Sequence, residues 1–327
     1  MTGDRDNWRP TASWEMLRRR AALLAQLRTF FARHGFLEVE TPLLSADTVV
    51  DRHLDPFGVP ISGPPAATNP QYWLQTSPEF AMKRLMAAGG EAIYQVTRAF
   101  RRDEQGQRHN PEFTIVEWYR VGDSLDAGMQ FLSELCQEML GTPPAVQLTY
   151  QAAFQQHVGI DPHTATNEEI VEAARHHGVS APESLGTADR DAWLDLLLVT
   201  LIEPHLGKVA PTILHDYPPS QAALAIVRPG PPPVAERFEL YVRGIELANG
   251  YHELLDPHAL GARNRENNRA RVADGKRPLP EESRLLAAME TGLPACCGVA
   301  LGFDRVVMLA TGASSIDEVI AFPFDRA

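Results

Sequence analysis

Cysteine is scarce in this 327-residue sequence, and long apolar runs are missing. The three cysteines, Cys136, Cys296 and Cys297, are odd in number and two are adjacent. They therefore match neither an even disulfide framework nor the C-x-x-C spacing of a metal site. No stretch approaches the roughly 20 apolar residues that a membrane-spanning helix needs, and the N-terminus lacks the apolar core of a secretory signal. We expect a cytoplasmic protein in a reducing compartment, with no membrane partner.

Basic charge is also in short supply, because 30 lysines and arginines stand against 42 aspartates and glutamates, a formal net charge of −12. Broad nucleic-acid binders usually carry a basic surface, so this balance argues against such a role but leaves room for a local anion site. The sequence has no P-loop, no G-x-G-x-x-G after a strand and no G-x-S-x-G elbow. His252-Glu253 begins like the zinc motif H-E-x-x-H, but Asp256 stands where the second histidine would be. These absences exclude the commonest nucleotide, hydrolase and zinc sites.

The pattern of apolar and turn residues predicts an α+β domain with a mostly antiparallel sheet, because strands follow hairpin-like loops and helices group elsewhere. Residues 1–13 are expected to form an N-terminal arm and 58–70 a loop. The expected strands cover 36–40, 93–102, 113–119, 238–243, 245–253 and 295–301. One expected helix ends at His34-Gly35 and has Leu17, Ala21, Leu24, Leu27 and Phe31 on its apolar face, and another is capped by Ser77. Further helices are expected over 124–140, much of 166–202, and 303–311. The charged segment 263–277 is expected to form a helix that faces solvent.

The first group of chemically active residues surrounds a strand–loop–strand segment. Residues 99–104 and 109–113 are dense in arginine, carboxylate and histidine. Alternation along the second strand places Phe113, Glu117 and Tyr119 on one face, which is an unusual composition for a core. The alternative interpretation is a solvent-facing strand of an amphipathic hairpin.

The second group lies near a tight turn at 243–244. Glu239 and Glu246 flank this turn, and Asn249, Tyr251 and Glu253 alternate on one face of the strand that follows. Neighbouring carboxylates repel unless a cation lies between them, and hard divalent cations prefer oxygen ligands. The pair therefore indicates Mg²⁺ bound to nucleotide phosphates, with a pair of exposed surface glutamates as the alternative.

The third group is the strand–helix segment 298–305. Small residues at alternate positions leave one strand face without bulk, so a flat ligand can lie against the backbone. Arg305 follows in the first turn of a helix, where N–H groups and a guanidinium together suit phosphate. The alternative is tight packing of strand on helix with an exposed arginine.

Taken in order, these segments resemble the three motifs of class II aminoacyl-tRNA synthetases. Residues 40–44 resemble motif 1, whose proline lies at a dimer interface; 100–103 with His109 and Phe113 resemble motif 2; and 298–305 resemble motif 3. The closer resemblance is to lysyl-tRNA synthetase, through TSPEFAMKRL, RHNPEFTIVEWY, ERFELYVRGIE and GIELANGYHELLD. It implies one catalytic domain over 14–327, an antiparallel sheet flanked by helices, with a helical insertion at about 150–205, and a homodimer.

The resemblance also implies a role for each matching residue. Those that would bind ATP are Arg101, Asp103, Glu104, His109, Asn110, Phe113, Glu239, Glu246, Gly302 and Arg305. Among them Arg101 and Arg305 would be catalytic, and Glu239 and Glu246 would hold Mg²⁺. Those that would bind the amino-acid substrate are Ser77, Glu79, Glu117, Tyr119, Asn249, Tyr251, Glu253 and Ala300.

Departures from lysyl-tRNA synthetase narrow the resemblance further. The motif 1 helix is expected near residue 14, which leaves no room for an anticodon-reading domain; Asp103 replaces the motif 2 glutamate, Ala300 a motif 3 glycine and His252 a serine. Such short paralogues resemble the ligases that activate (R)-β-lysine as an adenylate and transfer it to a lysine of elongation factor P. We therefore expect elongation factor P and a lysine isomer as partners, with no stable tRNA binding. An enzyme that charges an RNA or a small molecule, and a non-catalytic binding paralogue, are the alternatives.

Overall fold

The computed structural model describes residues 8–61, 71–182 and 185–327, and these form two compact units. Unit 1 comprises Met1–Gly122, Leu255–Cys296 and Ala300–Ala327, and unit 2 comprises Asp123–Leu254 with Cys297–Val299. Strand β12 (Cys296–Gly302) is therefore divided between the units. In the described residues no helix combines the length and apolar character needed to cross a membrane.

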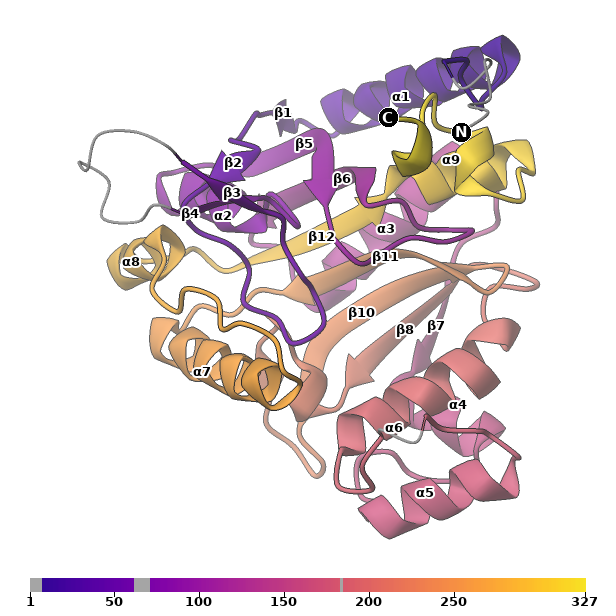
Figure 1. Cartoon of the computed structure of the whole chain (residues 1–327), viewed down its shortest axis with the longest axis vertical. Coiled ribbons are helices and arrows are strands. Elements are labelled where there is room, and N and C mark those ends of the chain that lie inside the picture. Colours follow the sequence, from indigo (N-terminus) through magenta and orange to yellow (C-terminus); the bar gives the residue numbers. More distant parts are fainter. Residues whose placement is uncertain (1–7, 62–70, 183–184) are drawn as a thin grey trace, which may run out of the picture. The chain divides into compact units, whose positions relative to one another are not determined.

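Unit 1 contains a sheet in which β5 (Ala92–Phe100) lies between β1 (Leu37–Glu38) and β6 (Glu112–Val121). The β5–β6 pair is antiparallel and in continuous register, whereas β1 runs parallel to β5. A smaller sheet has the order β2 (Leu44–Ser45), β4 (Gln71–Leu74), β3 (Gly58–Pro60). The helices of this unit, seen in Figure 1, are α1 (Trp14–Arg33), α2 (Glu79–Ala87), α7 (Pro257–Ala273), α8 (Arg284–Thr291) and α9 (Phe303–Thr311), with 3₁₀ turns at Ile316–Glu318 and Phe324–Arg326.

Unit 2 has the strand order β11-β10-β8-β7, with β9 paired to β10. These strands are β7 (Val146–Thr149), β8 (Thr212–Tyr217), β9 (Val227–Arg228), β10 (Val234–Val242) and β11 (Ile245–His252). The helices are α3 (Leu125–Leu140), α4 (Tyr150–His157), α5 (Asn167–His176) and α6 (Arg190–Leu197), then a π-helical turn at Leu198–Ile202 and 3₁₀ turns at Glu203–His205 and Pro219–Gln221. As Figure 1 shows, α4, α5 and α6 group together, and a hydrophobic cluster of their own holds them. The helical character expected at about 150–205 is thus present.

Helix α1 has the predicted ends but only part of the predicted buried face. Ser13 caps it by accepting a hydrogen bond from the Met16 N–H, and Gly35 follows it with a φ of 76°. The buried residues are Leu23, Leu27, Phe30 and Phe31. Of the predicted apolar stripe Leu27 and Phe31 are buried, Leu17 and Leu24 are half-buried and Ala21 is exposed, so the stripe was only partly right. The reason is that a charged residue, Arg20, lies on the inner face and pairs with a buried aspartate, as described below.

Helix α7 corrects a second expectation, that residues 263–277 form a helix facing solvent. The helix ends at Ala273 and buries Asn264, Asn268 and Arg271 at helical spacing. The Arg271 guanidinium lies 2.7 Å from the Asp55 carboxylate, with both side chains buried. A polar stripe of this kind is stable inside a protein because every group has a partner.

The remaining differences concern short segments. The strand expected over 36–40 is the two-residue β1, and Gly58–Pro60 forms β3 rather than loop. In the predicted arm, the Thr11 N–H donates to the Ala321 carbonyl at 2.9 Å, so this part is attached to the C-terminal segment. Residues 1–7 and 62–70, which complete the predicted arm and loop, lie outside the described residues.

The β10–β11 hairpin forms as predicted around Arg243-Gly244. Both residues have positive φ, 55° and 73°, which matches the twist of a tight two-residue turn. A register shift after Leu240 places Glu239 opposite Asn249, whereas Glu246 lies opposite Tyr241. The two predicted metal-binding glutamates are therefore not direct cross-strand partners.

Candidate active site

A buried carboxylate on β6 forms the centre of the site in unit 1. Glu117 is only 1% exposed, and its oxygens accept hydrogen bonds from the hydroxyls of Ser77 and Tyr119, each at 2.6 Å. Burial, together with the charge of nearby Glu79, raises the pKa of Glu117 to about 7. Ile115 and Tyr119 are buried as well, so the alternative of a solvent-facing hairpin strand is wrong.

Helix α2 brings Glu79 beside this carboxylate. Ser77 accepts a hydrogen bond from the Glu79 N–H at 3.1 Å and donates to Glu117, so one hydroxyl connects helix and strand. Pro78, not Ser77, occupies the N-cap position of α2, which corrects the predicted cap. Glu79 is buried and accepts from the Lys83 ammonium at 2.6 Å. The structure thus brings together four predicted substrate residues: Ser77, Glu79, Glu117 and Tyr119.

Arg101 lies after β5 and faces an aromatic ring of β6. Its guanidinium is 5.0 Å from the centre of the Phe113 ring and 3.3 Å from the Glu104 carboxylate. Asp103 instead pairs with its neighbour Arg102, and both side chains are more than half exposed. Glu104, rather than Asp103, is therefore the acidic residue of this loop that contacts Arg101.

Arg305, in the first turn of α9, contacts His109 in the loop before β6. The Arg305 Nη2 lies 2.6 Å from His109 Nε2. Neighbouring groups reduce the hydration of the His109 ring, and this desolvation and the charge of Arg305 both lower its pKa. The ring is therefore neutral at pH 7, and Nε2 accepts the hydrogen bond. Two predicted ATP-binding residues are thus side by side, and Arg305 is half-buried rather than a freely exposed arginine.

A charged network from three elements supports this corner. Asp304 is 2% exposed and accepts from the Thr114 N–H on β6 at 2.8 Å. Arg20 of α1 lies 2.6 Å from Asp304 and donates to the Thr114 hydroxyl at 2.7 Å. Because Thr114 follows Phe113 and Asp304 precedes Arg305, the network fixes the spacing of two predicted ATP residues.

Other predicted residues of unit 1 have less distinct surroundings. Asn110 is buried, donates to the Glu112 carbonyl and accepts from the Phe324 N–H, so its amide is used within the protein. Ala300 and Gly302 are the half-buried positions of β12 in unit 1. Their predicted ligand contacts remain predictions.

In unit 2, Glu239 of β10 is buried and already has several donors. The hydroxyls of Tyr217 and Tyr241 donate to one of its oxygens at 2.6 and 2.5 Å, and Arg237 donates to the other. Burial and the Glu239 charge hold the pKa values of both tyrosines well above their ordinary range, so they remain donors. Glu239 is therefore a fixed carboxylate whose three donors leave room for about one further ligand, and its burial rules out the interpretation as an exposed surface glutamate.

The strand opposite supplies an unused oxygen. Asn249 faces Glu239 across the hairpin, and its shielded Oδ1 has no hydrogen-bond partner among the described residues. Glu246 is half-buried, and Glu253 is 1% exposed. A search of the described residues finds no cluster of three or more His, Cys, Asp or Glu side chains suited to a metal. Mg²⁺ bound with nucleotide needs only one or two carboxylates and phosphate oxygens, so this oxygen-rich donor set fits it.

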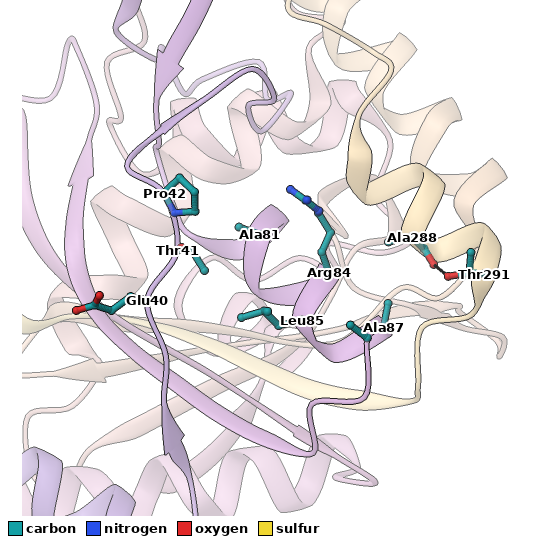
Figure 2. A pocket seen from close by; sticks show the side chains of 10 residues that line it. Glu40, Thr41, Pro42, Ala81, Arg84, Leu85, Ala87, Ala288 and Thr291 are labelled. Atoms are coloured by element: carbon teal, nitrogen blue, oxygen red, sulfur yellow. Dashed lines mark hydrogen bonds between the residues drawn. The ribbon is translucent and has the colours of Figure 1, made fainter.

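A separate pocket of about 490 Å³ lies in unit 1 and involves none of the predicted ATP or substrate residues. Figure 2 shows motif 1 residues on one side, α2 in the middle and α8 on the other side. Its lining consists of Glu40, Thr41, Pro42, Ala81, Arg84, Leu85, Ala87, Ala88, Ala288 and Thr291. The pocket is therefore separate from the predicted ATP and substrate residues, and motif 1 residues form one of its sides.

Comparison with known proteins identifies the family of this chain. The family model "tRNA synthetases class II (D, K and N)" matches residues 6–326, so the chain belongs to the class II tRNA synthetase family. Within it, the chain is 48% identical over 320 residues to an elongation factor P–(R)-β-lysine ligase of Klebsiella pneumoniae, with 98% of each chain covered. It is 47% identical over 324 residues to the ligase of that name from Vibrio vulnificus, with 98% of this chain and 99% of the relative covered.

Three charged residues of the site were not identified from the sequence. Lys83 has a visible signal, since it stands four residues after Glu79 on a predicted helix, where opposite charges meet. Arg237 stands two residues before Glu239, on the same strand face. Arg20 gave no signal, because its partner Asp304 is distant in sequence.

Proposed function

We propose that this protein activates (R)-β-lysine with ATP as an adenylate and transfers it to a lysine side chain of elongation factor P. The observation that carries the proposal is the buried carboxylate of Glu117. Hydrogen bonds from Ser77 and Tyr119 hold it in place, and its negative charge suits a cationic group. The names of the relatives, which cover nearly the whole chain, support the choice of amino acid and acceptor.

The charge of the site favours an ammonium-bearing substrate. Opposite unit charges about 4 Å apart attract by about 4 kcal/mol at an effective dielectric near 20. A neutral side chain would leave Glu117 either uncompensated or protonated, which costs several kcal/mol of binding free energy. A lysine isomer therefore binds in preference to asparagine or aspartate, the substrates of other branches of this family.

The proposed ATP site is supported by cationic and aromatic side chains that lie next to one another. Arg101, His109 and Arg305 bind the phosphates, and Phe113 stacks on the base. The substrate carboxylate attacks the α-phosphorus in line and pyrophosphate leaves, while the two guanidiniums stabilise the charge that develops. Mg²⁺, when bound through Glu239 and Glu246, neutralises phosphate charge. The acceptor amine then attacks the adenylate carbonyl and AMP leaves.

The motif 1 segment supports a homodimer as the working form. Leu37, Leu43 and Leu44 are 65%, 40% and 38% exposed, and they lie in or beside the chain segment that lines the pocket of Figure 2. Neighbouring exposed leucines of this kind mark interaction surfaces. A second copy of this chain is the occupant that we propose.

Pyrophosphate exchange tests the activation step without any acceptor. Purified protein receives ATP, Mg²⁺ and radiolabelled pyrophosphate with (R)-β-lysine, (S)-β-lysine, α-lysine or asparagine in separate reactions. We expect exchange with lysine isomers, fastest with (R)-β-lysine, and none with asparagine. Absence of exchange with every isomer would favour the non-catalytic paralogue.

A further inference from the structure

A lysine side chain is buried among the residues that we assign to a lysine-like substrate. Lys83 of α2 has a side chain only 1% exposed, and its ammonium donates to Glu79 at 2.6 Å. Lysine is almost never fully buried unless it is paired. The role of this cation is not explained by binding ATP or by forming the adenylate.

The groups that face Glu117 within unit 1 form one connected set. Ser77 precedes α2, Glu79 and Lys83 lie on α2, Tyr119 lies on β6, and the uncharged Gln95 is opposite Glu117 on β5. Lys83 is the cation of this set. With both carboxylates ionised, the three charged groups have a net charge of one negative unit, which is the charge that one substrate ammonium neutralises.

We propose that Lys83 is a positioning residue for substrate recognition: it holds Glu79 in place and neutralises its charge, so that Glu117 keeps the charge that receives the substrate ammonium. This inference rests on the proposed function, because it concerns the same substrate.

Removing the Lys83 charge should raise the pKa of Glu117. Burial and the Glu79 charge raise the pKa of Glu117 to about 7, whereas the Lys83 charge acts in the opposite direction. An ammonium pairs with the ionised carboxylate, so kcat/KM for the amino acid rises with pH as Glu117 loses its proton. Without the Lys83 charge the ionised form is less favoured, and this rise moves to higher pH.

The test measures kcat/KM for (R)-β-lysine in pyrophosphate exchange between pH 5.5 and 9. For Lys83→Met we expect the acid limb to move up by about one pH unit, which lowers kcat/KM at pH 7 about fivefold because Glu117 is about half ionised there in the wild type. We expect kcat at pH 8.5 to change by less than about threefold, because the limb reports the free enzyme. Lys83→Arg keeps the charge and should leave the limb in place.

A matched control separates charge from packing. Met86 is an uncharged residue buried on the same helix, so Met86→Ala should lower stability but not move the acid limb. If Lys83→Met does not fold, Lys83→Met combined with Glu79→Gln removes both charges; we expect this variant to fold, with the limb near its wild-type position. An unmoved limb in Lys83→Met, or an equal movement in Met86→Ala, would overturn the proposal.

A second measurement does not depend on activity. Carboxyl ¹³C NMR of glutamate-labelled protein follows the titration of Glu117, and Glu117→Gln identifies its signal. We expect a higher pKa for Glu117 in Lys83→Met than in wild type, and the same pKa in both would overturn the role of Lys83. A wild type that is inactive with every lysine isomer, but shows this difference, would contradict the proposed function alone.

Discussion

Arg101, in the loop after β5, and Arg305, in the first turn of α9, are the two guanidiniums that we propose to bind the phosphates. Each is held by a neighbour, Glu104 or His109, so each is oriented before any ligand binds. Pre-oriented donors are effective because they need little rearrangement when charge develops.

We predict that Arg101→Ala and Arg305→Ala each lower the rate of pyrophosphate exchange by about 10²–10³, because one donor to the developing charge is lost. Arg102→Ala is the matched control, since Arg102 is exposed and pairs only with the adjacent Asp103 in the contacts described above. The control should retain near-normal exchange with an unchanged melting temperature. Near-normal exchange in Arg101→Ala or Arg305→Ala would show that the phosphate site has been placed wrongly.

Ala300 is the position at which one methyl group distinguishes this chain from the synthetases that it resembles. It is half-buried on β12, on the face where Gly302 also lies. We predict that Ala300→Gly raises activity with α-lysine relative to β-lysine, because a methyl crowds the amino group of an α-amino acid. A contact of this size changes selectivity by roughly 10–200-fold. The ratio of the two kcat/KM values measures the effect, and an unchanged ratio would refute it.

Individual residues were predicted well where one strand carries several of them. Alternation along β6 placed Glu117 and Tyr119 on one face, and both are buried there. The resemblance supplied their roles, which alternation cannot do. Lys83 was missed because a charged residue on a helix is usually solvated, and only Glu79 and the surrounding burial show that it is not.

At the scale of elements, α1 contributes to the site through one side chain. Arg20 stacks 5.1 Å from the centre of the Phe303 ring and pairs with Asp304, whose carboxylate also holds the β6 backbone. A helix of the predicted dimer segment is therefore connected directly to the residues that flank Phe113 and Arg305.

We predict that Arg20→Met lowers the free energy of unfolding by about 3–5 kcal/mol, because it leaves Asp304 charged and buried without its partner. Arg28 offers a control on the same helix, since its pair with Glu38 is 47% and 37% exposed. Arg28→Met should cost less than about 1 kcal/mol. Urea denaturation measures both, and equal losses would contradict the role assigned to the Arg20–Asp304 pair.

The same network explains what could be predicted of the elements. Apolar periodicity found α1 but gave its inner face only in part, because Arg20 occupies an inner position that the pattern treats as polar surface. In α7 the buried positions after Leu260 are two asparagines and an arginine, so periodicity predicted a solvated helix. Both failures have one cause: a buried polar residue is recognisable only with its partner, and the partners Asp304 and Asp55 are far away in sequence.

At the scale of the whole molecule, the first question is how many copies work together. We predict a homodimer at micromolar concentration, which light scattering would detect as twice the 36.1 kDa chain mass. Leu37→Asp should shift the protein toward monomer, because it introduces a charge into the proposed contact. Val209→Asp is the control, since Val209 is 97% exposed outside the motif 1 segment. A wild type that is monomeric, or a loss of dimer in both variants, would contradict this surface.

The family and the fold class were predictable because the motifs are local and occur in order along the chain. The division into two units was not, because it depends on pairings between distant segments, such as α7 and α8 with the N-terminal elements. The acceptor follows neither from the motifs nor from the fold. It is inferred from the relatives and from the net charge of −12, which repels a polyanion such as tRNA unless a local basic patch compensates.

Identification of the acceptor is therefore the most direct test. The protein is incubated with ATP, Mg²⁺ and (R)-β-lysine, together with either elongation factor P or total tRNA, and the intact mass of the protein acceptor and the label on RNA are measured. We predict that elongation factor P gains the mass of one β-lysyl group at a lysine side chain and that tRNA gains no label. Label on tRNA with an unchanged mass of elongation factor P would contradict the proposed function.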